Sequence, residues 1–190
     1  TTEDFFQVPS LYYDDQLKRL WIGTGSAGLF YYDIIRKSLS DIPIRNFPKQ
    51  PILAIRKDAK NTLLIGIDGQ GIWNISEKGD TILHIYKEDL NNPFSLRGDG
   101  VYDILCDGSK NWIATFTGKL SFFENNNSQI TPVTYQINNP NSLGNNYVNQ
   151  IIEDHEGHIW FATNNGVSRW DAASNKWKHY YQNKSEQAKV

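Results

Sequence analysis

The 190-residue sequence contains no methionine and only one cysteine, Cys106. A single cysteine cannot form an internal disulfide bond, and it cannot build a cysteine-based metal site. Because Cys106 follows the apolar residues Ile104 and Leu105, we expect a buried, unreactive thiol. The lack of methionine, the start at Thr1 and the lack of a signal-peptide pattern lead us to expect a segment of a longer protein.

Long apolar runs and an excess of positive charge are also lacking. No stretch approaches the ~18 consecutive apolar residues of a membrane-spanning helix, so we expect no direct membrane insertion by this segment. The 19 basic and 21 acidic residues give a net charge of −2, which leaves no basic stripe for phosphate groups. We therefore expect no nucleic-acid partner.

Motifs of common catalytic and cofactor sites are missing as well. The sequence has no glycine-flanked serine elbow, no phosphate-binding loop and no dinucleotide fingerprint. Glu153 and Asp154 are adjacent and so point to alternate faces of a strand, unlike the two carboxylates that flank a sugar bond in a glycosidase. We predict no catalytic residue and no cofactor.

One predicted turn holds side chains that could bind a metal ion. His155 and His158 flank this turn together with Asp154 and Glu156, but no further ligand is evident elsewhere in the sequence, so we predict no metal and interpret these side chains as solvated. An acidic residue recurs before the equivalent turn of each unit described below, without the dense oxygen ligands of a calcium loop. We expect these side chains to cap their own turns. They are Asp15, Asp58, Asp107 and Asp154.

Aromatic residues, by contrast, are abundant. The chain has 6 Trp, 10 Tyr and 9 Phe, or 13% of its residues, together with 14 Gly, while amphipathic runs of good helix formers are scarce. This balance favours β-structure with tight turns.

One pattern recurs four times along the chain. Each copy has an apolar strand with a large central residue, then a strand that begins with glycine. The large residues are Trp21, Leu64, Trp112 and Trp160, with spacings of 43, 48 and 48 residues. A period of about 40–50 residues with several strands per unit is typical of a propeller blade. We expect this column to fill the space between blades, as core residues.

Further segments repeat with the same period. A short apolar strand that ends in an acidic turn precedes each copy, at 11–15, 53–58, 101–107 and 148–154. The connector 91–96 returns at 138–143 with five identities in six positions. Small residues share one column, where we expect little lateral room near the axis of a radial assembly. They are Gly23, Gly66, Ala114 and Ala162.

The repeats predict an all-β fold. We expect a β-propeller built of four-stranded antiparallel blades, with about four blades present, as one partial propeller over residues 1–190. The predicted blades span approximately 5–47, 48–90, 99–136 and 146–183. We expect either an open arc or a ring closed by other means. Because an open arc leaves two sheet faces uncovered, we also expect self-association.

The units resemble the regulator-propeller repeat of two-component proteins. The clearest match begins at Val148, includes Glu153-Asp154 and Trp160, and ends at Asp171. The stretch 20–33 also fits well. The second unit departs from the pattern, because Leu64 replaces the tryptophan and Asp68 extends the turn. The third unit shortens its first turn by one residue.

The resemblance implies a fold, a place and a function. It implies a fragment of a seven-bladed propeller in the periplasmic sensor region of a Bacteroidetes-type hybrid two-component system protein. Remaining blades, downstream sensor domains, a membrane span and the histidine kinase would lie outside this chain. The ligand implied by the resemblance is a glycan or oligosaccharide.

A candidate binding surface follows from the four-strand reading. Turns between the second and third strands emerge on the same face as the connectors between blades. Amides, hydroxyls, an arginine and an aromatic ring suit sugar hydroxyls or uronate groups. The alternative that these residues only bind water and link blades stays open. The candidates are Arg97, Asp99, Asn146, Tyr147, Asp68, Gln70, Thr117, Asn164 and Asn165, with Thr24 and Ser26 in the first unit.

The sequence is compatible with three functions. The first is a non-catalytic extracytoplasmic sensor segment that senses a ligand or relays its signal to a kinase outside this chain. The second is a protein–protein interaction scaffold, and the third is a propeller lyase or hydrolase. Fold alone does not decide among them.

Overall fold

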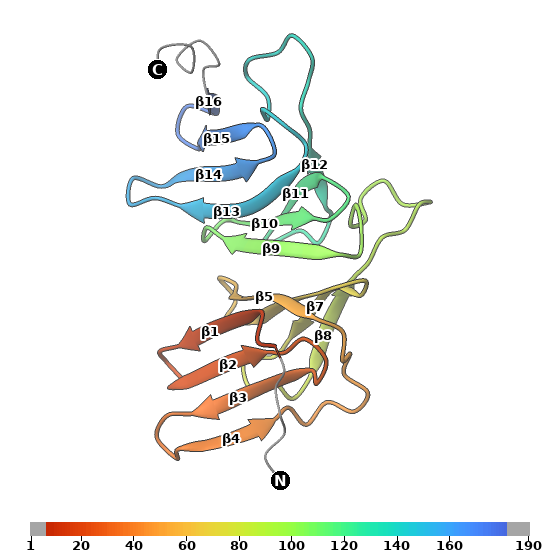
Figure 1. Ribbon diagram of the computed structural model, residues 1–190, viewed down its shortest axis with the longest axis vertical. Coiled ribbons are helices and arrows are strands. Elements are labelled where there is room, and N and C mark those ends of the chain that lie inside the picture. The colour runs from red at the N-terminus through yellow and green to blue at the C-terminus, as the bar shows by residue number, and fades with distance from the viewer. Residues whose placement is uncertain (1–6, 182–190) are drawn as a thin grey trace, which may run out of the picture.

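The computed structural model describes residues 7–181. Over these residues the chain forms sixteen strands in four antiparallel sheets of four, and consecutive strands are neighbours within each sheet (Figure 1). The predicted four-stranded antiparallel units are confirmed. Residues 5, 6, 182 and 183 of the predicted blades lie outside the described residues.

The strands of the first two sheets have the following bounds. The first sheet contains β1 (Ser10–Asp14), β2 (Arg19–Gly23), β3 (Leu29–Asp33) and β4 (Ser38–Asp41). The second sheet contains β5 (Ile52–Lys57), β6 (Leu63–Ile67), β7 (Gly71–Ile75) and β8 (Ile82–Tyr86).

The third and fourth sheets repeat this order. The third sheet contains β9 (Val101–Cys106), β10 (Lys110–Thr115), β11 (Lys119–Glu124) and β12 (Thr131–Val133). The fourth sheet contains β13 (Val148–Glu153), β14 (His158–Thr163), β15 (Gly166–Asp171) and β16 (Lys176–Tyr180).

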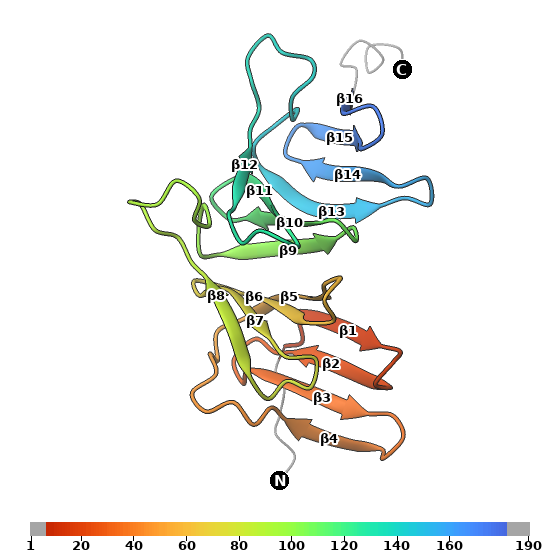
Figure 2. The same ribbon diagram turned by 180° about the vertical axis from the view of Figure 1, so that it is seen from behind.

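The first strand of each sheet lies innermost in the assembly. Strand β1 contacts β5, β5 contacts β9, and β9 contacts β13. Figures 1 and 2 show the sheets following one another along the long axis, with the first sheet at one end and the fourth at the other. Neighbouring sheets meet face to face, as blades of a propeller do. The described residues therefore form an arc of four blades.

The core consists of three apolar clusters, one in each space between neighbouring sheets. The large residue of each unit faces the next sheet. Trp21 lies in the first cluster, Leu64 in the second and Trp112 in the third, and each is at most 1% exposed. The prediction that this column packs between blades is confirmed at these three positions. Trp160 lies on the outer face of the fourth sheet and is partly exposed.

The small-residue column also has the expected physical cause. A Cβ atom at Gly23 would lie 2.6 Å from Cγ2 of Ile52, and one at Gly66 would lie 2.9 Å from Cγ1 of Val101. Both contacts come from the inner strand of the next sheet. Such distances are too short for a side chain, so these positions require glycine for close approach of the sheets.

Polar links join the inner strands across the sheets. The Nζ atom of Lys57 donates to Oδ2 of Asp14 at 3.0 Å and also pairs with Glu77. Further along, Nη2 of Arg56 donates to Oδ1 of Asp103 at 3.0 Å, and Oδ2 of Asp103 accepts the amide of Ile151 at 2.9 Å. Burial raises the pKa of Asp103 despite these favourable contacts. A single carboxylate therefore links three consecutive sheets.

Among residues 7–181 the structure contains no helix with the length and hydrophobicity required to cross a membrane.

Candidate functional site

The meander order of each sheet sends its loops to two opposite ends. In an antiparallel sheet, the turns after the first and third strands share one end, and the remaining turns and connectors share the other. Figure 1 shows the first turns on the left and the long connector 87–100 on the right. We call the second end the loop face. It consists of the turns 24–28, 68–70, 116–118 and 164–165 and the connectors 42–51, 87–100 and 134–147.

Hydrogen bonds to backbone carbonyls hold turns and connectors of the loop face together. The hydroxyl of Thr117 donates to the carbonyl of Arg97 at 2.8 Å. The carbonyl of Asp99 accepts the amide of Gly71 at 2.8 Å, and the amide of Asn164 donates to the carbonyl of Tyr147 at 3.1 Å. The candidate residues therefore lie in loops that contact one another in pairs.

Several candidate side chains are occupied by neighbouring groups. The Oδ1 atom of Asp99 accepts the amide of Glu88, and Oδ1 of Asn146 accepts the amide of Tyr135, both at 2.7 Å. These two bonds occupy equivalent places in repeated connectors. Elsewhere, Gln70 accepts from Lys87, and Asn164 accepts from Asn149. Inter-loop hydrogen bonding therefore explains Asp99, Asn146, Gln70 and Asn164.

Other candidate side chains keep free polar groups. Arg97 donates from Nη2 to the carbonyl of Pro93 at 2.6 Å, while its buried Nε has no partner among the described residues. The side chains of Asp68 and Asn165 form no hydrogen bond within residues 7–181, and both are at least partly exposed. In the first unit, by contrast, the Thr24 hydroxyl is buried and occupied, because it donates to the carbonyl of Gly28.

Exposed aromatic rings gather around the turn 116–118. Tyr102, Phe116 and Tyr147 are 38%, 41% and 53% exposed, and we call them the aromatic group. The ring centroids of Tyr102 and Phe116 are 3.7 Å apart, and the Tyr147 ring covers Gly118. Of these three residues, only Tyr147 is among the candidates predicted from the sequence. Tyr102 is the extra residue of a bulge in β9, which overrides simple strand alternation.

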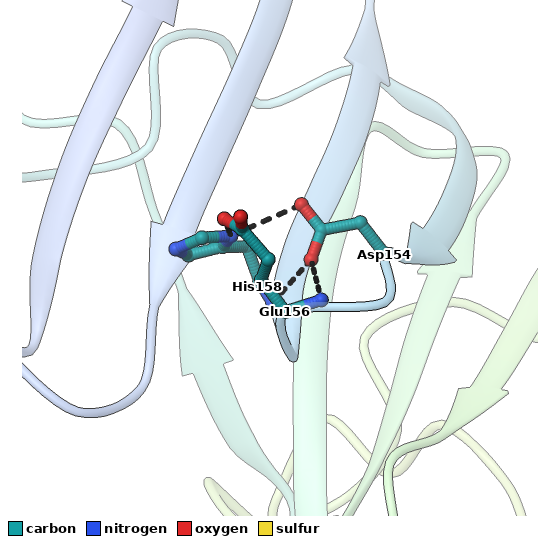
Figure 3. Close-up of side chains that lie close together, drawn as sticks. All are labelled: Asp154, Glu156 and His158. Atoms are coloured by element: carbon teal, nitrogen blue, oxygen red, sulfur yellow. Dashed lines mark hydrogen bonds and ion pairs between the residues drawn. The ribbon is translucent and has the colours of Figure 1, made fainter.

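The opposite end contains a cluster of ionisable groups in the β13–β14 turn. Figure 3 shows that the side chains of Asp154, Glu156 and His158 lie close together. One potential ligand atom from each residue lies within 4.8 Å of the others. Oδ2 of Asp154 is 3.0 Å from Nδ1 of His158 and accepts the indole N–H of Trp160 at 2.7 Å. Oδ1 accepts the amides of Glu156 and His158. These bonds, with that of Trp160 first, hold the pKa of Asp154 well below its usual range.

The acidic column has the capping role that the sequence predicted, with one correction. Asp58, Asp107 and Asp154 accept amides of their own turns. In the first unit Asp14, not Asp15, accepts the amides of residues 16 and 17. Asp15 instead forms an exposed pair with Lys18. Turn geometry therefore accounts for the column.

A family model matches the segment in which the sequence most clearly resembles the regulator-propeller repeat. Residues 142–165 match the family described as "Two component regulator propeller". The match covers the end of the connector before β13, then β13, β14 and the start of the following turn. No curated protein matches the chain significantly.

Solved structures share the fold. The extracellular domain of a protein described as a hybrid two component system, BT3049 from B. thetaiotaomicron, is 20% identical with a TM-score of 0.68, over 94% of this chain and 25% of that one. The extracellular domain of BT4673 from the same organism, described as a one component system in one structure and a hybrid two component system in another, is 20% identical with a TM-score of 0.50, over 91% and 29%.

A propeller from a different setting matches as well. The Cps50 (Swd1) β-propeller domain of Myceliophteria thermophila is 12% identical with a TM-score of 0.63, over 93% of this chain and 56% of that one. The chain thus spans between a quarter and just over half of the length of these structures. The chain carries a two-component regulator propeller repeat within an all-β partial propeller whose fold matches extracellular domains from B. thetaiotaomicron.

Proposed function

We propose that the chain is a non-catalytic sensor segment in the periplasmic part of a hybrid two-component signalling protein. The observation that carries the proposal is the regulator-propeller match at 142–165 inside a four-bladed arc. In this proposal the segment senses or relays a glycan or oligosaccharide signal to a histidine kinase outside the chain. The four blades would form part of a seven-bladed ring.

The loop face is the proposed ligand surface. It offers the aromatic group for flat, apolar sugar faces and free polar groups for hydroxyls. The proposed contacts are the candidate residues that the sequence predicts for this face, above all those whose side chains neighbouring groups leave free. Of these, Arg97, Asp68, Asn165 and Tyr147 are the best placed.

A thermal-shift titration with a panel of oligosaccharides tests this proposal. A ligand at 100 times its Kd stabilises the native state by about 2.7 kcal/mol, which raises Tm by roughly 5–10 °C for a chain of this size. Tyr147→Ala should abolish the shift. Tyr13→Ala, at an exposed tyrosine of β1 away from the loop face, is the matched control. Accumulation of cleaved or unsaturated sugar products would contradict a non-catalytic role.

We also propose that neighbouring blades cover the two end sheets in the parent protein. The first sheet exposes Leu11, Tyr13 and Leu39, and the fourth exposes Ile152 and Tyr180. Corresponding faces inside the arc are buried. The isolated chain should therefore self-associate through these faces. Sedimentation of a monodisperse monomer at high protein concentration would overturn this part of the proposal.

A further inference from the structure

A cavity of about 320 Å³ lies between the second and third sheets, at the end opposite the loop face. Its walls include Asp58 and Thr62 of the β5–β6 turn, Asn74 of β7 and the ring of Tyr86. The turn 124–128 between β11 and β12 closes the opposite wall. We call this space the inter-sheet cavity. None of the loop-face candidates lines it.

The cavity arises where the second sheet departs from the repeat. In the first sheet the cross-strand neighbours Trp21 and Tyr31 pack with ring centroids 5.4 Å apart. In the third sheet Trp112 and Phe122 occupy the same two places, with centroids 5.2 Å apart. The equivalent neighbours in the second sheet are Leu64 and Asn74. Two large rings are therefore replaced by smaller side chains in one row.

The facing turn does not fill the space that the missing rings leave. Opposite the first sheet, the β7–β8 turn approaches so closely that a Cβ at Gly79 would lie 2.6 Å from the Trp21 ring. Opposite the second sheet, the β11–β12 turn presents asparagines instead. Asn125 is fixed there, because it accepts from Nδ2 of buried Asn111 at 2.9 Å and donates to the carbonyl of Gly108 at 2.8 Å. The wall is therefore polar and held in place.

The lining chemistry indicates a neutral ligand that carries hydroxyl groups. Oδ1 of Asn74 is buried and has no hydrogen-bond partner among the described residues. A buried amide oxygen without a partner is unfavourable, and a hydroxyl donor that reaches it would satisfy it. The aromatic part of the wall is the stack of Tyr86 on Phe123, with ring centroids 4.7 Å apart, and His84 also contacts Tyr86.

Charge excludes an anionic ligand at this place. The lining includes the carboxylates of Asp58 and Glu124 against the single ammonium of Lys60. Asp58 is only 7% exposed and already accepts the Thr62 hydroxyl and two turn amides. An added carboxylate or sulfate would therefore meet uncompensated negative charge. The volume lies at the lower end of ligand pockets, about 300–1,000 Å³, which suits one sugar ring.

We infer that the inter-sheet cavity is a binding site for a neutral, hydroxyl-bearing ligand of monosaccharide size, in which the amides of Asn74 and the 125–127 turn contact hydroxyls. This inference rests on the proposed sensing of glycans and adds a second site at the opposite end of the blades. The loop face, which carries Arg97, remains the place for larger or acidic sugars.

The first test variant introduces the tryptophan of the repeat into the second sheet. Leu64→Trp places in the second sheet the residue that the other three sheets carry. Because Leu64 is the cross-strand neighbour of Asn74 in the cavity wall, we expect the larger ring to reduce the cavity. Asn74→Leu keeps a similar volume and removes the amide, so it serves if the first variant unfolds. Circular dichroism confirms that each variant is folded. Tyr13→Ala, at an exposed tyrosine of β1 away from both the cavity and the loop face, is the matched control.

The probes are D-galactose, D-glucose and D-mannose, with D-glucuronate as the anionic counterpart. Two-dimensional NMR titration measures the binding of each probe. We expect saturable shifts with a neutral sugar in the parent chain and in Tyr13→Ala. We expect Leu64→Trp and Asn74→Leu to bind the neutral sugar at least about tenfold more weakly than the parent chain, equal to about 1.4 kcal/mol. We expect the parent chain to bind D-glucuronate more weakly than the neutral sugar by a similar factor. Lack of saturation with all three neutral sugars, or equal affinity in the cavity variants, overturns the inference. An oligosaccharide that still binds and depends only on Tyr147 would leave the proposed function intact while this second site fails.

Discussion

Replacement of Trp112 by alanine should be among the most destabilising single changes in this chain. Trp112 is 1% exposed and lies between the third and fourth sheets. Its ring is 5.1–5.3 Å from the rings of Phe122, Phe161 and Trp170, and its indole N–H donates to Asp107 at 2.8 Å. Truncation therefore removes core contacts to both sheets and one hydrogen bond.

The expected loss is about 4–5 kcal/mol. A buried tryptophan replaced by alanine costs roughly 3–5 kcal/mol, and the aromatic pairs favour the upper end of that range. Urea unfolding followed by far-ultraviolet circular dichroism measures it without relying on tryptophan fluorescence. With a slope of about 2–3 kcal/mol per molar, the midpoint should fall by roughly 1.3–2.5 M.

Trp160→Ala is a matched control, because it makes the same change at the same repeat position on an uncovered face. The Trp160 ring stacks on Tyr180 with centroids 5.4 Å apart and donates to solvent-accessible Asp154. Its loss should cost only about 1–2 kcal/mol, since water can replace the lost bond. Equal midpoint shifts for the two variants would refute the claim that packing between sheets makes the column stabilising.

Three further measurements follow from buried or hydrogen-bonded ionisable groups. Lys57→Met should cost about 3 kcal/mol in urea unfolding, because it leaves the buried carboxylate of Asp14 without its cation; a loss near zero would contradict this. Trp160→Phe should raise the pKa of Asp154 in a carbon-detected NMR titration, since the indole is the strongest influence that lowers it. Because that pKa is depressed in the folded state, its stabilisation is present above the unfolded value of about 3.9 and is lost as the pH falls, so the variant should lose less stability on acidification. Burial raises the pKa of Cys106 to about 12, so its thiol should not react with a disulfide reagent at pH 8 until urea unfolds the chain, and rapid labelling of the folded protein would show the site is open.

The repeat made the fold predictable because each blade must bury its large column residue against a neighbour. Trp21 and Trp112 are buried for that reason, and the glycine columns mark places where sheets approach closely. The error at Asp15 has a different origin. Two adjacent aspartates fit the same sequence pattern, and only the turn geometry decides that Asp14 accepts the amides.

The candidate site could be predicted from the sequence only in part. Strand order alone places the polar turns and connectors at one end, and the structure brings them into contact there. Strand order does not reveal that the side chains of Asp99 and Asn146 accept backbone amides of their own connectors. Nor does it reveal the bulge that carries Tyr102 to Phe116, because alternation assumes an unbroken ladder.

The departure at Leu64 shows why an exception in a repeat can carry more functional information than the repeat itself. The space between the second and third sheets keeps a continuous aliphatic core around Ile72, Ile104 and Ile113, all 0% exposed, and the pair of Arg56 with Asp103 joins the inner strands. These contacts offset the missing rings, so the chain can retain a polar cavity at that place. If the loss of the tryptophan were neutral drift, the lining should be apolar and collapsed. The buried, unpartnered Oδ1 atom of Asn74 in the cavity wall and the asparagines of the 125–127 turn instead argue for retention of a hydrogen-bonding site.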